Sequence, residues 1–130
     1  MPPNDTRYAR EWLGFAEKDL GRATRALQEN DPEIAGFFVQ QAVEKFLKAF
    51  LLAKGWKLVR THNLVALLDE AAAHDATLNR FRLVCHDISL FYLDSRYPAT
   101  LTGGWSEQEV RDSLRDVQEL IEQIRAALKT

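Results

Sequence analysis

At residues 37–50 the sequence reads FFVQQAVEKFLKAF, and this stretch decides how the chain folds. Apolar residues recur there every three or four positions, which is the spacing of an amphipathic helix. No acidic residue falls between position 45 and position 68, and this interval holds five cations, namely Lys45, Lys48, Lys54, Lys57 and Arg60. A helix that packs on one side and shows positive charge on the other indicates an anionic partner.

The size and composition of the chain favour a single domain over residues 1–130. The 130 residues are 46% hydrophobic and carry a formal net charge of −2. This content supports one core and argues against disorder. Because the chain as a whole is not basic, any nucleic-acid contact would come from a local patch. The single cysteine, Cys85, excludes an internal disulfide, and its place on an apolar helical face predicts a small core residue.

The sequence contains no signal for a membrane, a metal or a cofactor. The first residues lack a signal-peptide pattern, and the longest apolar stretches are too short to cross a bilayer, so we expect a cytoplasmic protein. The three histidines, at positions 62, 74 and 86, lack the spacing of a metal site. Glycine-rich phosphate loops and nucleophile elbows are missing, so we expect neither a metal nor a cofactor.

The hydrophobic pattern predicts five helices and almost no strand. The expected ranges are 6–28, 32–54, 61 or 63 to 73, 76–93, and a last helix that follows the capping-box pattern of 106–109 and ends near 128. Asp31 is a good N-cap before Pro32, and Gly55 is a good left-handed C-cap. The sequence therefore predicts an all-α, up-and-down bundle of four long helices plus one short helix. Apolar stripes on more than one side of the long helices also suggest a symmetric dimer.

One short segment contains candidates for catalysis. Arg80 and Arg82 precede His86 in the stretch RFRLVCH. An arginine that stabilises a phosphate and a histidine that moves a proton are the minimum for metal-free RNA cleavage. Short spacings of this kind arise often by chance, and on one continuous helix positions 80 and 86 would lie about 120° apart.

Two readings of the central basic residues stay open. Lys45 and Lys48 lie on neighbouring ridges of one helix, where they either face solvent or contact an anion. Glu44 can also pair with Lys48 across one turn. His62 either packs at the start of the third helix or faces a ligand beside Arg60. The acidic last helix could balance the basic run, within one copy or across a dimer.

The end of the fourth helix is equally open. In the stretch Ser95-Arg96-Tyr97-Pro98 the proline favours a helix stop, with Tyr97 packed back on the bundle. The functional alternative places Arg96 at the mouth of a groove, where its planar guanidinium can hold phosphate. The loop from 94 to 105 is long for a link between two helices, and such loops often have a function.

Four ordered stretches together resemble the HEPN domain family (higher eukaryotes and prokaryotes nucleotide-binding). The resemblance covers nearly the whole chain and is carried by EWLGFAEKDL at 11–20, FVQQAVEKFLKA at 38–49, THNL at 61–64 and SRYP at 95–98. It implies a helical bundle that usually forms a homodimer. Similar members are often encoded beside a minimal nucleotidyltransferase, in pairs regarded as toxin–antitoxin modules, and others bind nucleotides.

The resemblance also implies candidate site residues. Many family members are metal-independent RNases with an arginine, four to six residues and then a histidine, but no histidine follows Arg96 here. The sequence therefore favours a dimeric binding partner of a nucleotidyltransferase, with a groove for nucleotide or RNA phosphate. An endoribonuclease toxin and a structural protein–protein adaptor are the alternatives. The residues that fit the family's polar pattern are Gln41, Glu44, Lys45, Lys48, His62, Arg96 and Tyr97.

Overall fold

The fold is built around one central helix. The computed structural model describes residues 4–57, 60–94 and 105–129, and the regular elements in those ranges are all helical. In chain order they are α1 (Asn4–Gln28), α2 (Pro32–Ala53), α3 (Leu64–Ala72), the 3₁₀ helix η1 (Ala76–Phe81), α4 (Arg82–Asp94) and α6 (Glu107–Ala127). The predicted all-α bundle with one short helix in its middle is confirmed.

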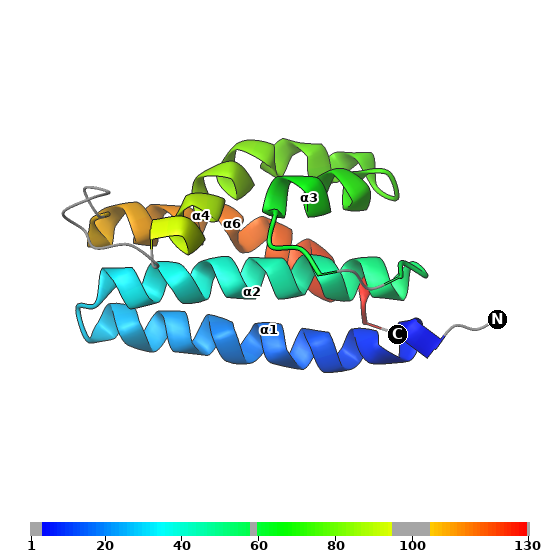
Figure 1. Cartoon of the computed structure of the whole chain (residues 1–130), viewed down its shortest axis with the longest axis horizontal. Helices are drawn as coiled ribbons and strands as arrows, with labels where there is room; N and C mark the ends of the chain where they lie inside the picture. The colour runs from blue at the N-terminus through cyan, green and yellow to red at the C-terminus, as the bar shows by residue number, and fades with distance from the viewer. Residues whose placement is uncertain (1–3, 58–59, 95–104, 130) are drawn as a thin grey trace.

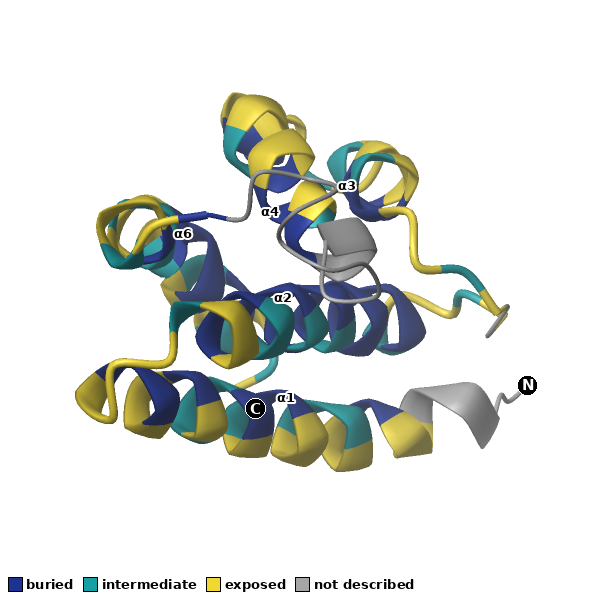
Figure 2. Cartoon of the chain, turned by 60° about the vertical axis from the view of Figure 1, so that its left-hand side comes forward, coloured by how far each residue is buried: buried dark blue, intermediate teal, exposed yellow. Residues whose placement is uncertain are grey.

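Helix α2 lies between two layers of helices. Helix α1 runs antiparallel along one side of it, and α3, α4 and α6 lie on the other side (Figures 1 and 2). Fourteen of the 22 residues of α2 are buried, which is why its dark blue surface in Figure 2 extends around the ribbon. The wide apolar stripe of residues 37–50 predicted a helix covered on more than one side, and α2 has this arrangement.

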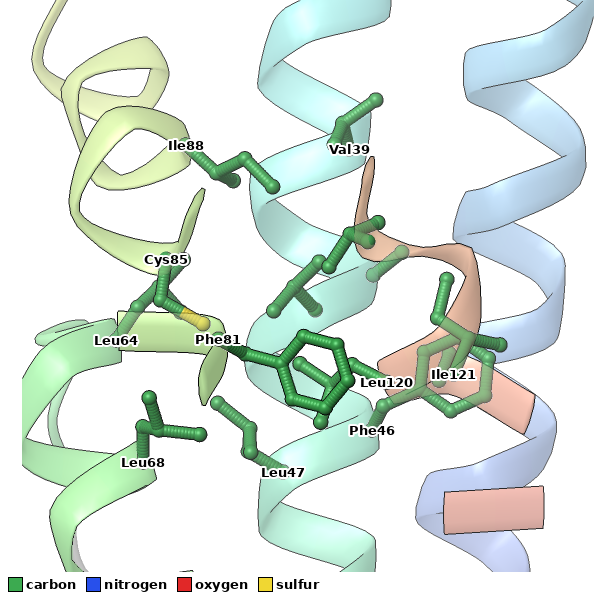
Figure 3. Close-up of a cluster of buried hydrophobic side chains, with 14 of the residues drawn as sticks. Val39, Phe46, Leu47, Leu64, Leu68, Phe81, Cys85, Ile88, Leu120 and Ile121 are labelled. Carbon is green, nitrogen blue, oxygen red and sulfur yellow. The ribbon is translucent and has the colours of Figure 1, made fainter. Parts of the chain in front are cut away.

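The core forms where α2 meets the upper layer. Phe46 and Leu47 of α2 sit at its centre (Figure 3). Around them pack side chains from the other elements, including Leu64, Leu68, Phe81, Cys85, Ile88, Leu120 and Ile121. Burial raises the pKa of the Cys85 thiol to about 12, so the side chain is a neutral core residue at physiological pH, as the sequence predicted.

The helix ends follow the caps that the sequence offers. The carboxylate of Asp31 accepts a hydrogen bond from the first turn of α2, and the side chain of Asn63 does the same for α3. Ser106 and Glu109 form the complete capping box of α6. Gly55 has φ 88°, the left-handed conformation expected after α2.

The prediction of one α-helix over residues 76–93 is wrong for its first turns. Residues 76–81 form the 3₁₀ helix η1, and the α-helix begins only at Arg82. The carboxylate of Asp75 accepts hydrogen bonds from the backbone N–H and the hydroxyl of Thr77, while the Gln123 amide of α6 donates to both residues. These bonds tie the start of the segment to α6 and favour the tighter 3₁₀ winding, which is common at helix beginnings.

A tryptophan joins the start of α6 to the start of α2. The indole Nε1 of Trp105 donates a hydrogen bond to the carbonyl of Pro32 at 2.8 Å, and its ring lies 5.1 Å from the ring of Phe91. The ring rests directly on Gly36, where an added Cβ would lie 2.6 Å from the indole nitrogen. This position on α2 therefore requires a residue without a side chain.

We predict that Gly36→Ala destabilises the protein by about 1–3 kcal/mol. The methyl group would displace the Trp105 ring, and this overpacking together with the lost hydrogen bond outweighs alanine's better helix propensity. The matched control is Gly14→Ala on α1, where an added Cβ meets nothing within 4 Å. Urea unfolding should show that variant unchanged or stabilised by up to about 1 kcal/mol. Equal effects of the two substitutions would contradict the packing.

Candidate functional site

A row of polar side chains crosses the otherwise apolar helix α2. Gln40, Glu44 and Lys48 follow each other at intervals of four, so they share one ridge of the helix. Each is almost fully buried, at 0%, 3% and 5% exposure. Together with Gln41 and His62 they form one hydrogen-bonded network, which we call the polar seam.

The carboxylate of Glu44 is the centre of the polar seam. Its Oε1 atom accepts a hydrogen bond from the Gln40 amide at 3.2 Å and lies 2.9 Å from Nδ1 of His62. Its Oε2 atom accepts from the Lys48 ammonium at 2.9 Å. The amide of Gln41 in turn donates to the Gln40 carbonyl at 2.7 Å. The polar seam is therefore formed mainly by residues of α2, and His62 extends it to the segment before α3.

His62 is the part of the polar seam that reaches the surface. Its side chain is 55% exposed, whereas that of its partner Glu44 is 4% exposed. An ionised carboxylate only accepts hydrogen bonds, so Nδ1 of His62 carries the proton. The imidazole is thus fixed in orientation by a buried acid. The next residue, Asn63, caps α3 and anchors the backbone beside the ring.

The other end of the polar seam touches α1. The Lys48 ammonium lies 5.4 Å from the centre of the Trp12 ring, within the range of a cation–π contact. Its side chain is only 6% exposed. Lys48 therefore sits between an aromatic face on α1 and the carboxylate of Glu44, and the network continues across α2 from Trp12 to His62.

A second buried carboxylate lies beside the seam on α1. Asp19 is 1% exposed and accepts hydrogen bonds from Lys45 of α2 and, at 2.6 Å, from Arg22. The Arg22 guanidinium also lies 5.7 Å from the ring centre of Phe38. The side chains of Lys45 and Arg22 are 24% and 47% exposed, so this pair of cations covers the acid from the surface.

These buried ion pairs are a costly way to stabilise a helical bundle. Desolvating charges such as Glu44 and Lys48 can cancel their mutual attraction, and apolar side chains of similar volume would often stabilise a fold as well or better. The polar seam is therefore not explained by stability alone, which makes it the candidate functional site. The buried side-chain polar atoms of the described residues all have hydrogen-bond partners, so the network is complete as built.

The prediction that α2 presents a positive face to solvent is wrong for Lys48. Lys48 is buried rather than exposed, and both Lys48 and Lys45 are neutralised by carboxylates. The cause is that α1 covers the ridge which the sequence alone leaves open. The exposed positive residues come later, at Lys54, Lys57 and Arg60, after the end of α2.

The structure brings most of the predicted binding residues together. Gln41, Glu44, Lys48 and His62 belong to one network, and Lys45 belongs to the adjoining pair with Asp19. The remaining two, Arg96 and Tyr97, lie outside the described residues.

The three residues predicted as catalytic candidates contact different parts of the structure. Arg80 of η1 donates to Glu119 and Gln123 of α6. Arg82 pairs with Asp69 of α3, and this hydrogen bond raises the pKa of its guanidinium. His86 is exposed, with Nδ1 3.6 Å from Asp87. Since Arg80 lies before the junction of η1 and α4, it does not share a helix with His86.

Sequence reasoning missed three members of the site. Asp19 and Gln40 are buried partners of the predicted residues, and Trp12 supplies the aromatic face over Lys48. One signal was available, since Asp19 falls beside the apolar row of Ala16 and Ala23 on α1. A carboxylate at the edge of such a row needs a cation from the helix packed against it.

The described residues contain neither a metal centre nor a membrane span. In residues 4–57, 60–94 and 105–129, no three histidine, cysteine or acidic side chains gather as metal ligands would. Among the helices in the same ranges, none combines the length and the hydropathy needed to cross a bilayer.

The all-α bundle with a polar network on its central helix defines the structural class of this chain. Comparison with known families identifies this class, because the HEPN domain model matches residues 9–127. The chain therefore belongs to the HEPN domain family. It is also similar to a solved structure, the crystal structure of TT1696 from Thermus thermophilus, with a TM-score of 0.82 and 25% identity. That similarity covers 92% of this chain and 98% of the other. No curated protein matches the chain.

We predict that Glu44→Gln destabilises the protein by about 3 kcal/mol, because it leaves the buried Lys48 ammonium without a charged partner. Adding Lys48→Met should recover most of this loss. Urea unfolding of the single and double variants measures the coupling, expected to be at least about 1 kcal/mol.

The matched control for that cycle is Glu107→Gln on α6. Glu107 forms an ion pair with Arg111 at the same spacing, but both side chains are at least 40% exposed. The expected loss is below about 1 kcal/mol. Additive effects of the Glu44 and Lys48 substitutions, or an equal loss at Glu107, would rule out a buried network.

Proposed function

We propose that this HEPN protein is the dimeric helical partner of a minimal nucleotidyltransferase, in a pair of the toxin–antitoxin type. In this proposal the surface around His62 binds a phosphate of a nucleotide or of RNA. The observation that carries the proposal is the imidazole of His62, half exposed and oriented by the buried carboxylate of Glu44. An oriented ring beside charged groups is suited to recognise a ligand rather than to fill a core.

The charges near His62 support an anionic ligand. Arg60 is exposed two residues before the ring, and Lys57 is exposed in the same stretch. The buried acids Glu44 and Asp19 are balanced by Lys48 and Lys45, so they add no net repulsion. In this proposal a phosphate contacts the His62 ring and the Arg60 guanidinium, while Lys48 offsets the charge of the Glu44 carboxylate behind the ring.

A row of aromatic residues along one side of α1 supports the dimer. Tyr8 and Phe15 are 39% and 47% exposed, and they lie on the same side of α1 as Trp12, whose ring packs edge-on against Phe15 at 6.1 Å. A row of large aromatic residues on one helix is typical of a protein–protein contact. A second copy that covers this row would bring two polar seams to one interface.

Fluorescence titration with a fluorescent ATP analogue, the corresponding GTP analogue and short RNA tests the phosphate site. We predict saturable binding that weakens as salt rises. His62→Gln should weaken binding roughly ten-fold, which corresponds to the loss of one charge-assisted hydrogen bond. His74→Gln is the matched control, since His74 is also exposed but lies beyond α3.

Two results would contradict this proposal. One is the absence of any saturable signal with all three probes at millimolar concentration. The other is unchanged affinity in the His62→Gln variant, which would place the ligand elsewhere. Circular dichroism of each variant separates a loss of binding from a loss of folding.

A further inference from the structure

A groove with a volume of about 710 Å³ runs between α4 and α6, on elements that the polar seam does not use. The ion pair of Arg80 with Glu119 lies at one end of it. The ring contact of Phe91 with Trp105 lies at the other. Its lining spans residues 80–91 and 105–119, so the two helices border it in antiparallel directions.

The floor of the groove is apolar, and one of its edges exposes two large apolar side chains. Phe81, Phe91 and Trp105 are 5%, 6% and 9% exposed and form the floor. Leu83 and Leu90 of α4 lie on the edge and are 79% and 47% exposed. They are seven residues apart, so they stand on the same face of α4, two turns from each other. Leucine side chains that face water do not stabilise a helix. A pair of them on one face is suited to contact an apolar surface.

The opposite edge of the groove is acidic. Glu109, Asp112, Asp116 and Glu119 follow one face of α6 at spacings of three and four, and Asp87 adds a carboxylate from α4. Glu109 is held in the capping box of α6, and the partners of the other three acids of α6 lie at the surface. Arg115 pairs with both aspartates of α6, and its side chain is 69% exposed. Exposed pairs of this kind are worth little, so an incoming cation can compete for the acids.

We infer that this groove binds an amphipathic helix of a partner protein, with aliphatic residues on one face and lysine or arginine beside them. Residues 109–119 extend over about 15 Å at 1.5 Å per residue, which is roughly three helical turns. A helix of that length presents anchors at i, i+3, i+4 and i+7 to a groove. The leucines and the floor would receive the aliphatic anchors, and the acidic ridge of α6 would receive the cations.

A second copy of this chain is a poor occupant. In a two-fold contact through the groove, the acidic ridge of α6 would approach the same ridge of its partner, and like charges would face each other. The inference is independent of the proposed function, because it uses α4 and α6 and none of the polar seam. The nucleotide titrations and the groove test can therefore fail separately.

A designed peptide of leucine and lysine is the probe. Its leucines are placed at i, i+3, i+4 and i+7, and a scrambled peptide of the same composition is the first control. We expect saturable changes in the amide NMR signals of residues 80–91 and 109–119 only with the amphipathic peptide. Leu83→Ser should weaken its binding by on the order of ten-fold, while Ile34→Ser, which changes a 48% exposed residue of α2, should leave it unchanged.

A double variant tests whether the acidic ridge of α6 attracts the cations of the peptide. Asp112→Asn with Asp116→Asn should weaken binding and flatten its salt dependence, because two carboxylates are lost from the ridge. Glu29→Gln with Glu33→Gln removes the same charge from exposed positions around the start of α2 and should have little effect.

Three outcomes would overturn the inference. The scrambled peptide could bind equally well, the NMR changes could lie outside the groove, or Leu83→Ser could bind like the wild type. Sedimentation equilibrium adds a further check. A dimer that Leu83→Ser converts to monomer would assign the groove to a second copy instead.

Discussion

The structure depends on the burial of α2 from both sides. A helix enclosed by α1 and by α3, α4 and α6 has little contact with water, so each polar side chain on it must find a partner in the protein. Glu44 and Lys48 meet this demand by pairing with each other, at 3% and 5% exposure. Lys45 meets it by reaching Asp19 on α1. The polar seam is the consequence of this constraint.

The same constraint positions the exposed part of the site. Glu44 is fixed by its neighbours in α2, and the Asn63 cap fixes the start of α3, so His62 is held from two directions. Glu44, Lys45 and Lys48 of α2 therefore form ion pairs inside the fold instead of presenting free charges to solvent. The oriented imidazole of His62 reaches the surface, and exposed cations lie in the segment before it.

The molecule presents two surfaces of different character. The exposed cations Lys57 and Arg60 precede His62 in the chain, whereas the groove between α4 and α6 is apolar with an acidic edge. A net charge of −2 does not reveal this division, because it sums two opposite local charges. The two surfaces underlie the two proposals, an anionic ligand beside His62 and a basic helix in the groove.

Local signals predicted the fold well. Asp31, Gly55 and the Ser106–Glu109 capping box mark helix ends through contacts within a few residues, so they can be read from sequence. The 3₁₀ winding of η1 could not be read, because it depends on Gln123, which is far along the chain.

The buried network around Glu44 was predicted only in part for a related reason. Glu44 and Lys48 could be recognised as a pair from their spacing, but their burial depends on how α1 packs across α2. Periodicity gives the faces of a helix and does not say which neighbour covers each face. Asp19 was missed because its partner Lys45 lies 26 residues away, on the other helix.

The most direct test of this account is the protonation of His62 in the free protein. Two-dimensional NMR of the imidazole nitrogens, at a pH where the ring is neutral, reports which nitrogen carries the proton. We predict a proton on Nδ1, held there by the buried Glu44 carboxylate. A proton on Nε2, with Nδ1 unprotonated, would contradict the central claim that the polar seam orients this ring.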